Sequence, residues 1–248
     1  MNRGQGRRRR AGAAPPFRLA CPGRDQGDDR VSQAIHPALA GKHLYFGNLT
    51  TGERQYASGR FMGLALFPQH SREIRHDARE SLPVADGSVE KIQSQDVFEH
   101  LPYDELPPVL DDIHRALKPG GIFRLSLPDY GSPLLLKRCV FDEEGQILAD
   151  LRMGGSVAWD RKGKRRKVEF QPNGNAHLWF PTWQLVWGLI RRSKLEHCAE
   201  IRFHHYFVNT AEYVMLDYPE DEMFVMRAPP HDRRAGGLPI SLIVDFVK

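Results

Sequence analysis

The stretch from residue 76 to residue 130 constrains the fold of this chain most, because its pattern predicts two buried strands joined by one helix. We expect the first strand over residues 89–94 and the second over 122–127, where Pro128 stops it. Between them, apolar residues recur at helical spacing: Leu106, Val109, Leu110, Ile113 and Leu117. A strand, a helix and a strand with short links predict a right-handed parallel crossover.

The ends of this helix are marked in the sequence. Pro107 and Pro108 lack an N–H group and therefore fit only the first turn. Gly120 and Gly121 are expected to end the helix, because glycine tolerates the left-handed conformation of a C-terminal cap.

Polar residues stand where the predicted strands end. Asp77 follows one strand, residues 94–96 end the next, and Asp129 follows the strand after the helix. In open α/β sheets, ligands bind beyond the carboxyl ends of the strands. These side chains therefore predict a polar rim that could hold a ligand.

Four short motifs in this region resemble the core of class I S-adenosylmethionine-dependent methyltransferases. They are Asp77-Ala78, the run from Leu82 to Ser88 (LPVADGS), Glu99-His100-Leu101, and the run from Leu117 to Gly121 (LKPGG). Each motif alone is weak, but their order and spacing together are fairly specific. The resemblance covers roughly the middle quarter of the chain.

The resemblance implies an α/β, Rossmann-like fold with a mostly parallel seven-stranded sheet and helices on both faces. The residue patterns agree with about seven strands. Besides the two named above, we expect strands over 42–47, 61–67, 72–76, 199–207 and 241–247, and a further helix over 181–194 with Thr182 as its N-cap.

The resemblance also implies S-adenosylmethionine as the cofactor and positions for its binding residues. They are Gly47, Asn48, Ala65, Asp77, Ala78, Ser94, Gln95 and Asp96. Two elements depart from the family pattern: Leu49 replaces the second glycine of the loop after the first strand, and Ala65 replaces the acid that holds the ribose hydroxyls. Glu53 is the nearby acid that could substitute for it. Weakened cofactor binding follows from these changes.

Methyl transfer from a sulfonium needs alignment of the reactants and, for an acceptor that carries a proton, a base. The candidate catalytic residues are Asp129 and His177, although a turn cap is an equally good role for Asp129. For His100 and Glu99, a structural role is the preferred interpretation. No metal-ligand spacing is evident, and no metal site is expected.

The domain boundaries follow from composition. Residues 1–40 are rich in Arg, Gly, Ala and Pro, which predicts a disordered basic tail before a methyltransferase-like domain over 41–248. Residues 1–30 carry a net charge of +5, so the rest of the chain carries −1. Two hairpin patterns predict a β-rich insertion over 131–176, which would serve as a lid over the rim.

Three functions remain open at this stage. The first is methyl transfer to a small-molecule or glycan-type acceptor. The second is a catalytically silent methyltransferase-like domain that acts as a binding or scaffold module. A nucleic-acid partner, suggested by the Arg-rich tail and the basic run over 161–167, is disfavoured because the domain is nearly neutral. No apolar run reaches the length of a membrane span, and scattered cysteines favour a cytoplasmic location.

Overall fold

The computed structural model describes residues 35–159, 166–171 and 174–248. The first 34 residues, which hold most of the predicted tail, lie outside the described residues, as do residues 161–165 of the basic run. Pro37–Leu39 (η1), which the sequence placed in the tail, is a short 3₁₀ helix, and its Leu39 is buried in the main core. The packed chain therefore begins a few residues before the expected boundary.

The helical elements are few and mostly short. After η1 they are α1 (Arg54–Ser58), η2 (Phe98–His100), η3 (Tyr103–Glu105), α2 (Leu106–Ala116), α3 (Pro133–Leu136), α4 (Trp183–Ile190) and η4 (Lys194–His197).

The strands of the first half are β1 (His43–Phe46), β2 (Phe61–Ala65), β3 (Glu73–Arg75), β4 (Val89–Gln95) and β5 (Leu117–Pro128). Those of the insertion are β6 (Cys139–Phe141), β7 (Ile147–Asp150), β8 (Gly155–Trp159) and β9 (Arg166–Phe170). The chain closes with β10 (Glu200–Phe207), β11 (Tyr213–Met215) and β12 (Ser241–Val247).

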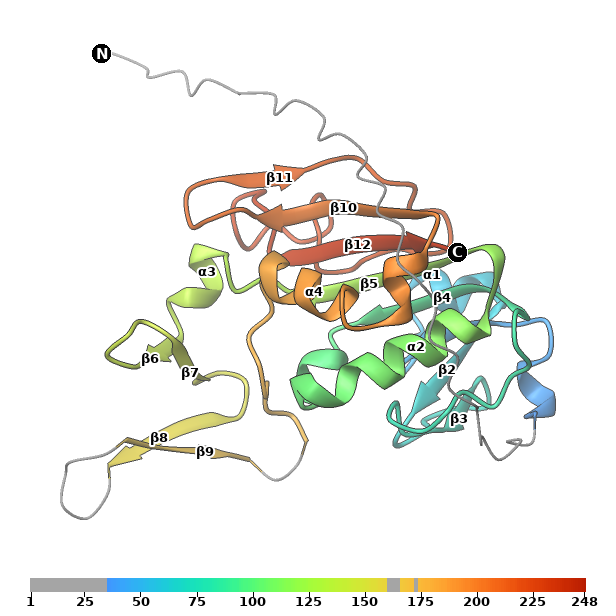
Figure 1. Cartoon of the computed structure of the whole chain (residues 1–248), viewed down its shortest axis with the longest axis horizontal. Helices are drawn as coiled ribbons and strands as arrows, with labels where there is room; N and C mark the ends of the chain where they lie inside the picture. Colours follow the sequence, from blue (N-terminus) through green and yellow to red (C-terminus); the bar gives the residue numbers. More distant parts are fainter. Residues whose placement is uncertain (1–34, 160–165, 172–173) are drawn as a thin grey trace, which may run out of the picture. The chain divides into compact units, whose positions relative to one another are not determined.

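Within the described chain, the central sheet has eight strands in the order β11-β10-β12-β5-β4-β1-β2-β3 (Figure 1). The five strands from β5 to β3 are parallel, while β12, β10 and β11 pair antiparallel. The predicted α/β Rossmann-like class is confirmed. The sheet exceeds the expected seven strands by the edge strand β11, which lies in the Pro- and Asp-rich region where the sequence showed no clear pattern.

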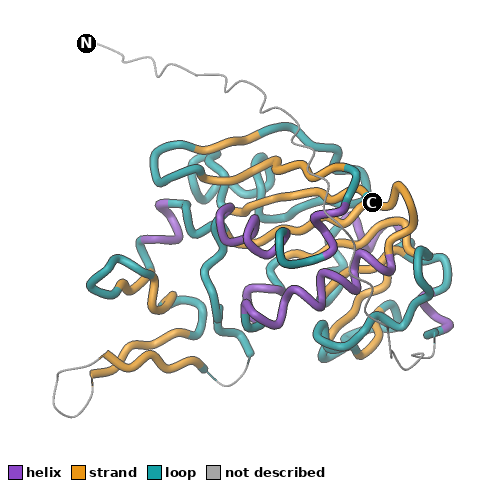
Figure 2. Tube along the Cα trace, in the orientation of Figure 1, coloured by secondary structure: helices purple, strands orange, loops and turns teal. Residues whose placement is uncertain are grey.

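Two layers cover the sheet unequally. Helices α2 and α4 lie together on one face (Figure 2), where Leu110, Ile113 and Val186 join the main core cluster. Tyr45 faces the opposite side, where it packs with Leu49, Phe61 and Met223. Among the helices described, only α1 contributes there, through Tyr56, and the irregular segment 216–240 supplies the remaining cover. This segment is too rich in Pro and Asp to form a helix.

One predicted helix boundary is wrong. Helix α2 ends at Ala116, with Leu117 as its cap, so it stops before the two glycines. Gly120 has a φ of 75°, and a Cβ on Gly121 would lie 2.9 Å from the Lys118 carbonyl oxygen. Both glycines therefore serve a tight bend at the start of β5, where the backbone passes close to its neighbours.

The insertion consists of α3 and the two antiparallel hairpins β6–β7 and β8–β9, as the hairpin patterns predicted. It follows the carboxyl end of β5, and the outer hairpin β8–β9 extends away from the sheet (Figure 1). Its inner part packs on the chain after β5, where the Tyr130 hydroxyl donates to Asp150 at 2.6 Å. Whether the insertion covers a bound acceptor stays a prediction.

Candidate functional site

The site begins at the switch point of the sheet, where β1 and β4 are neighbours and their connections leave in opposite directions. Gly47 follows β1 with a φ of 98°, a conformation that favours glycine. Asp96 follows β4 and also has a positive φ, of 52°. The polar residues that the sequence placed at the strand ends therefore meet on one rim.

The loop after β1 is fixed by an acid that the sequence analysis missed. Glu73 accepts hydrogen bonds from the Leu49 amide at 2.6 Å, the Gln69 amide at 2.6 Å and the Asn48 side chain at 2.9 Å. Burial alone would raise the pKa of Glu73, but these three hydrogen bonds outweigh it and hold the pKa below its ordinary value.

Glu73 reaches the loop because its neighbour on β2 has no side chain. A Cβ on Gly63 would lie 2.8 Å from the Glu73 Cγ. The Leu49 amide consequently donates a hydrogen bond to Glu73, and the Leu49 side chain is buried beside Tyr45 and Phe61. The loop is shaped by an internal carboxylate where the family has a second glycine.

The end of β2 carries no acid. Ala65 is buried, and it is followed by the exposed apolar side chains of Leu66 and Phe67. Glu53 lies 3.5 Å from the Tyr45 hydroxyl, and the charge of Asp96 raises its pKa in addition to the larger effect of burial. Glu53 therefore sits on the β1–β4 side of the rim and not at the end of β2.

Asp77, after β3, is bound by a neighbouring guanidinium. Arg79 donates to both carboxylate oxygens, at 3.0 and 2.6 Å, and these bonds lower the pKa of Asp77 to about 2. Ala78 packs partly buried against the main core. An incoming adenine would therefore meet an ionised and already paired acid.

The end of β4 is in contact with the segment 216–240. Gln95 donates to the Phe224 carbonyl at 3.1 Å and accepts from the Met226 amide at 3.0 Å. Arg227 pairs with Asp96 at 3.0 Å, although burial still raises the pKa of that carboxyl. The Ser94 hydroxyl and one oxygen of Asp96 are buried without a hydrogen-bond partner, which is the state expected of groups that await a ligand.

Asp129 is completely buried, and both of its carboxylate oxygens accept hydrogen bonds. It accepts from the Gly131 amide at 2.8 Å and from the Phe207 amide at 2.7 Å, one through each oxygen. Burial raises its pKa to about 6. This arrangement favours the anchoring role that the sequence left open beside that of a base.

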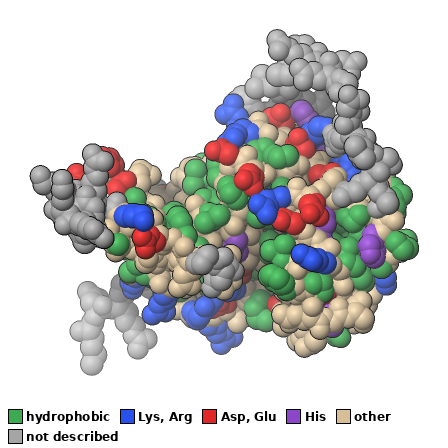
Figure 3. Space-filling view, turned by 90° about the horizontal axis from the view of Figure 1, so that it is seen from below, with side chains coloured by type: hydrophobic (Ala, Val, Ile, Leu, Met, Phe, Trp, Pro, Cys, Tyr) green, Lys and Arg blue, Asp and Glu red, His purple; other side chains and the backbone are tan. Residues whose placement is uncertain are grey.

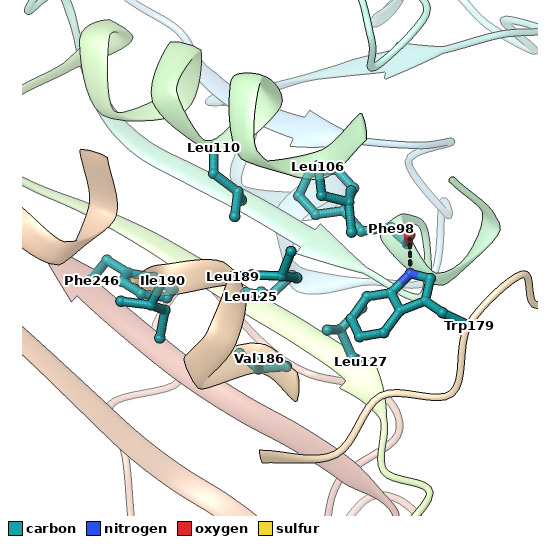
Figure 4. A pocket seen from close by; sticks show the side chains of 10 residues that line it. All are labelled: Phe98, Leu106, Leu110, Leu125, Leu127, Trp179, Val186, Leu189, Ile190 and Phe246. Carbon is teal, nitrogen blue, oxygen red and sulfur yellow. Dashed lines mark hydrogen bonds between the residues drawn. The ribbon is translucent and has the colours of Figure 1, made fainter. Parts of the chain in front are cut away.

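Three hydrogen bonds join residues 98–100 to residues 176–179, two segments remote in sequence, and hold His177 at the rim. We call this connection the clip. His100 Nδ1 bonds the Ala176 carbonyl at 3.0 Å, the Leu178 amide donates to the Glu99 carbonyl at 2.8 Å, and Trp179 Nε1 donates to the Phe98 carbonyl at 2.9 Å. The last bond is drawn in Figure 4, beside a void of about 10 Å³ with an apolar lining that includes Phe98, Trp179 and Val186. This void has room for about one water molecule and cannot hold a cofactor.

The clip gathers three side chains with metal-binding groups. Glu99, His100 and His177 each offer one ligand atom, and these atoms lie within 4.8 Å of one another. Burial lowers the pKa of His177 to about 3 and raises that of Glu99 well above its ordinary range. The sequence analysis had considered each residue separately, and no local signal placed them together.

Comparison with known proteins agrees with this architecture. Residues 34–125 match the family model described as a methyltransferase domain, a segment that runs from before η1 into β5. The resemblance to class I S-adenosylmethionine-dependent methyltransferases is thereby confirmed. A comparison with curated proteins found no match.

Solved structures with a similar fold include three methyltransferases. One is an S-adenosylmethionine-dependent methyltransferase from Mesorhizobium loti, with 17% identity, 86% of this chain and 94% of that chain covered, and a TM-score of 0.40. The second, from Archaeoglobus fulgidus, has 10% identity, 86% and 89% coverage, and a TM-score of 0.44.

The third is the 1,6-didemethyltoxoflavin-N1-methyltransferase of Burkholderia thailandensis, with 15% identity, 89% and 79% coverage, and a TM-score of 0.40. At identities and TM-scores this low, none of the three indicates what this chain acts on. None of the described helices has the length and apolar character needed to cross a membrane.

Proposed function

We propose that this chain binds S-adenosylmethionine at the rim formed by β1, β3 and β4 and transfers its methyl group to a small-molecule or glycan-type acceptor. The observation that carries the proposal is the methyltransferase-domain match over residues 34–125, which contains the rim residues of these strands. When bound, the cofactor supplies a methyl group on a positively charged sulfur.

The residues of the rim fit such a cofactor in part. Gly47 offers backbone without a Cβ, and Ser94 and Asp96 offer buried polar atoms that lack partners. Asp77 offers a carboxylate for the adenine, although Arg79 already binds it. The ribose has no acid at Ala65, and the exposed apolar groups of Leu66 and Phe67 supply contact area only.

These features support weak binding. A hydrogen bond to a charged group contributes about 1.5–3 kcal/mol, so the missing carboxylate at Ala65 costs roughly 10- to 100-fold in affinity. Restoring it with Ala65→Asp should tighten binding.

The acceptor would be bound beyond β4 and β5, on the side of Asp129 and His177. Both oxygens of Asp129 are occupied by backbone amides, whereas the Nε2 atom of His177 is buried without a hydrogen-bond partner. His177 is therefore the stronger of the two candidates for accepting a proton. Burial lowers the pKa of His177, so the imidazole is neutral at pH 7, but the same shift makes it a weak proton acceptor, and its candidacy rests on the free Nε2 atom.

A nucleic-acid acceptor has less support. On the face seen in Figure 3, Lys and Arg side chains lie among acidic and apolar ones, without the broad basic surface that phosphate tracking needs. A scaffold function without catalysis is the second candidate, and it is favoured by the Leu49 amide being already bound to Glu73.

One calorimetric experiment separates the two candidates. S-adenosylmethionine and S-adenosylhomocysteine are titrated into the wild type, Ala65→Asp and Asp77→Ala. Glu200→Ala is the matched control, because Glu200 is an exposed acid paired with Arg202 at the opposite edge of the sheet from the rim. The proposal predicts weak binding by the wild type, tighter binding by Ala65→Asp, weaker binding by Asp77→Ala and no change in the control. If no variant binds cofactor at millimolar concentration, the scaffold function replaces the enzymatic one.

A further inference from the structure

Two buried side chains within the clip, Glu99 and His177, are unusual in their hydrogen bonding. Glu99 is 0% exposed and His177 is 1% exposed. Both carboxylate oxygens of Glu99 and the Nε2 atom of His177 lack a hydrogen-bond partner. Leaving a carboxylate buried and unpaired is costly, so such groups normally bind another charge or a metal ion.

The tautomer of His177 is fixed by its surroundings. Its Nδ1 atom lies 2.6 Å from the Tyr130 hydroxyl, which in turn donates to Asp150 at 2.6 Å. Because the single hydroxyl proton goes to the carboxylate, His177 Nδ1 must be the donor to the Tyr130 oxygen. Arg138 Nε donates to the same oxygen of Asp150 at 2.7 Å. The lone pair of His177 is therefore on Nε2, which faces Glu99.

His100 is oriented in the same way. Its Nδ1 atom donates to the Ala176 carbonyl at 3.0 Å, which leaves the lone pair on Nε2. In metal sites, a ligating histidine commonly donates its other ring N–H to a carbonyl, a carboxylate or another acceptor, which fixes the ring. Both histidines of this cluster have that second contact.

Two of the three distances between ligand atoms are close to those around a tetrahedral ion. Glu99 Oε1 lies 3.6 Å from His177 Nε2 and 3.8 Å from His100 Nε2. Ligands at about 2.0–2.2 Å from Zn²⁺ in tetrahedral geometry are separated by roughly 3.3–3.6 Å. The three ligand atoms lie within 4.8 Å of one another, so binding would draw them closer together.

We propose that Glu99, His100 and His177 form a binding site for a divalent transition-metal ion of the Zn²⁺ class. Two imidazoles and one carboxylate suit Zn²⁺, whereas Mg²⁺ and Ca²⁺ prefer oxygen ligands. This ligand set revises the expectation from the sequence that the chain has no metal site, since the ligands come from segments 77 residues apart along the chain.

The site has an open side. The His100 side chain is 24% exposed, whereas those of Glu99 and His177 are 0% and 1% exposed. Three protein ligands would leave a fourth tetrahedral position for a water molecule or another ligand. If the proposed methyl transfer holds, a hydroxyl of the acceptor could occupy that position, and His177 would then act as a metal ligand and not as the base. This role rests on the proposed function, but metal binding itself does not.

The test uses the full-length, untagged protein after dialysis against chelator. Zn²⁺ and Mg²⁺ are titrated calorimetrically, and thermal unfolding is measured with and without Zn²⁺. We expect one Zn²⁺ per chain, no comparable Mg²⁺ binding, and a higher Tm with Zn²⁺, because an ion that binds only the folded state stabilises it.

Four variants locate the ion. Glu99→Gln and His177→Asn should each weaken Zn²⁺ binding by about 100-fold, since each removes one ligand. Tyr130→Phe keeps all three ligands but removes the hydroxyl that bonds both His177 and Asp150, and it should weaken binding by about 10- to 100-fold. His197→Asn, at an exposed histidine outside the cluster, is the matched control and should bind like the wild type.

Visible spectra of the Co²⁺-loaded protein distinguish this site from a cysteine site. Tetrahedral d–d bands without thiolate charge-transfer bands are expected. Thiolate bands, Zn²⁺ binding that survives both Glu99→Gln and His177→Asn, or equal affinity for Mg²⁺ would overturn the proposal. If a ligand variant does not fold, the Tyr130→Phe titration and the wild-type spectrum still decide the question. If the protein binds Zn²⁺ but not S-adenosylmethionine, the metal site stands and the methyltransferase proposal fails. If it binds S-adenosylmethionine but not Zn²⁺, the metal site fails and the methyltransferase proposal stands.

Discussion

Replacing Arg124 by methionine should destabilise the domain strongly, because Arg124 is the buried centre of a network that joins β5, β12 and the segment 216–240. Its guanidinium donates to both oxygens of Asp245, at 2.7 and 2.6 Å. It also donates to the carbonyls of Pro219 and Met223, at 2.8 and 2.7 Å. The central carbon of the guanidinium lies 4.7 Å from the centre of the Tyr218 ring. The side chains of Arg124 and Asp245 are only 3% and 9% exposed.

The magnitude follows from what the substitution leaves behind. Arg124→Met removes the guanidinium but leaves Asp245 buried with only His204 as a partner, at 3.0 Å. Breaking a buried ion pair by removing one partner costs about 3–5 kcal/mol. For a domain of this size, that free energy corresponds to a Tm decrease of roughly 6–20 °C.

The assay is urea unfolding of the full chain, followed by circular dichroism and hydrogen exchange. The urea midpoint should fall while the slope stays constant, and amides over residues 218–228 should exchange faster. Arg202→Met is the matched control, because Arg202 forms an exposed ion pair with Glu200 within β10, the strand beside β12, and its loss should leave the midpoint almost unchanged. Equal midpoints for the two variants would refute this reasoning.

A pH series adds a second check on the same pair. Burial opposes ionisation of Asp245, but the hydrogen bonds from Arg124 and His204 outweigh it and lower its pKa. A lowered folded-state pKa gives stability that is present above the unfolded pKa of about 4 and is lost as the pH falls below it. The difference between wild type and Arg124→Met should therefore shrink as the pH falls below about 4. A constant difference would contradict the assignment.

Three further predictions concern other parts of the chain. Asp129→Asn loses one of two buried backbone contacts and should cost about 1–3 kcal/mol in a denaturation experiment, whereas a catalytic base would lose turnover at unchanged Tm. Deleting residues 2–32 should leave the Tm nearly unchanged, because a composition rich in Arg, Gly, Ala and Pro cannot bury a core, while Leu39→Ala should cost about 2–5 kcal/mol because Leu39 is buried in the core. Burial lowers the pKa of His205 to about 4, so the free energy of unfolding should fall by about 1.4 kcal/mol per pH unit as the pH decreases from the ordinary histidine pKa toward 4. His205→Gln should remove this slope, and an unchanged slope in the variant would contradict the assignment to His205.

The sequence alone determined the parallel core of this protein. Apolar periodicity predicted α2, and apolar runs predicted the strands around it, because these patterns depend only on neighbouring residues along the chain. The predicted strand over 241–247 matches β12, and Thr182 caps α4 by accepting from the Leu185 amide at 3.5 Å. The methyltransferase motifs were visible for the same reason.

Tertiary structure decided which polar groups have hydrogen-bond partners within the protein and which have none. The sequence placed Asp129 at the rim, but only packing shows that backbone amides from its own turn and from Phe207 occupy both oxygens. Glu73 reaches the loop after β1 only because Gly63 lies beside it on the neighbouring strand. The cluster of Glu99, His100 and His177 exists only because hydrogen bonds clip two distant segments together. Contacts of this kind depend on distances set by the whole fold, and no local pattern of residues encodes them.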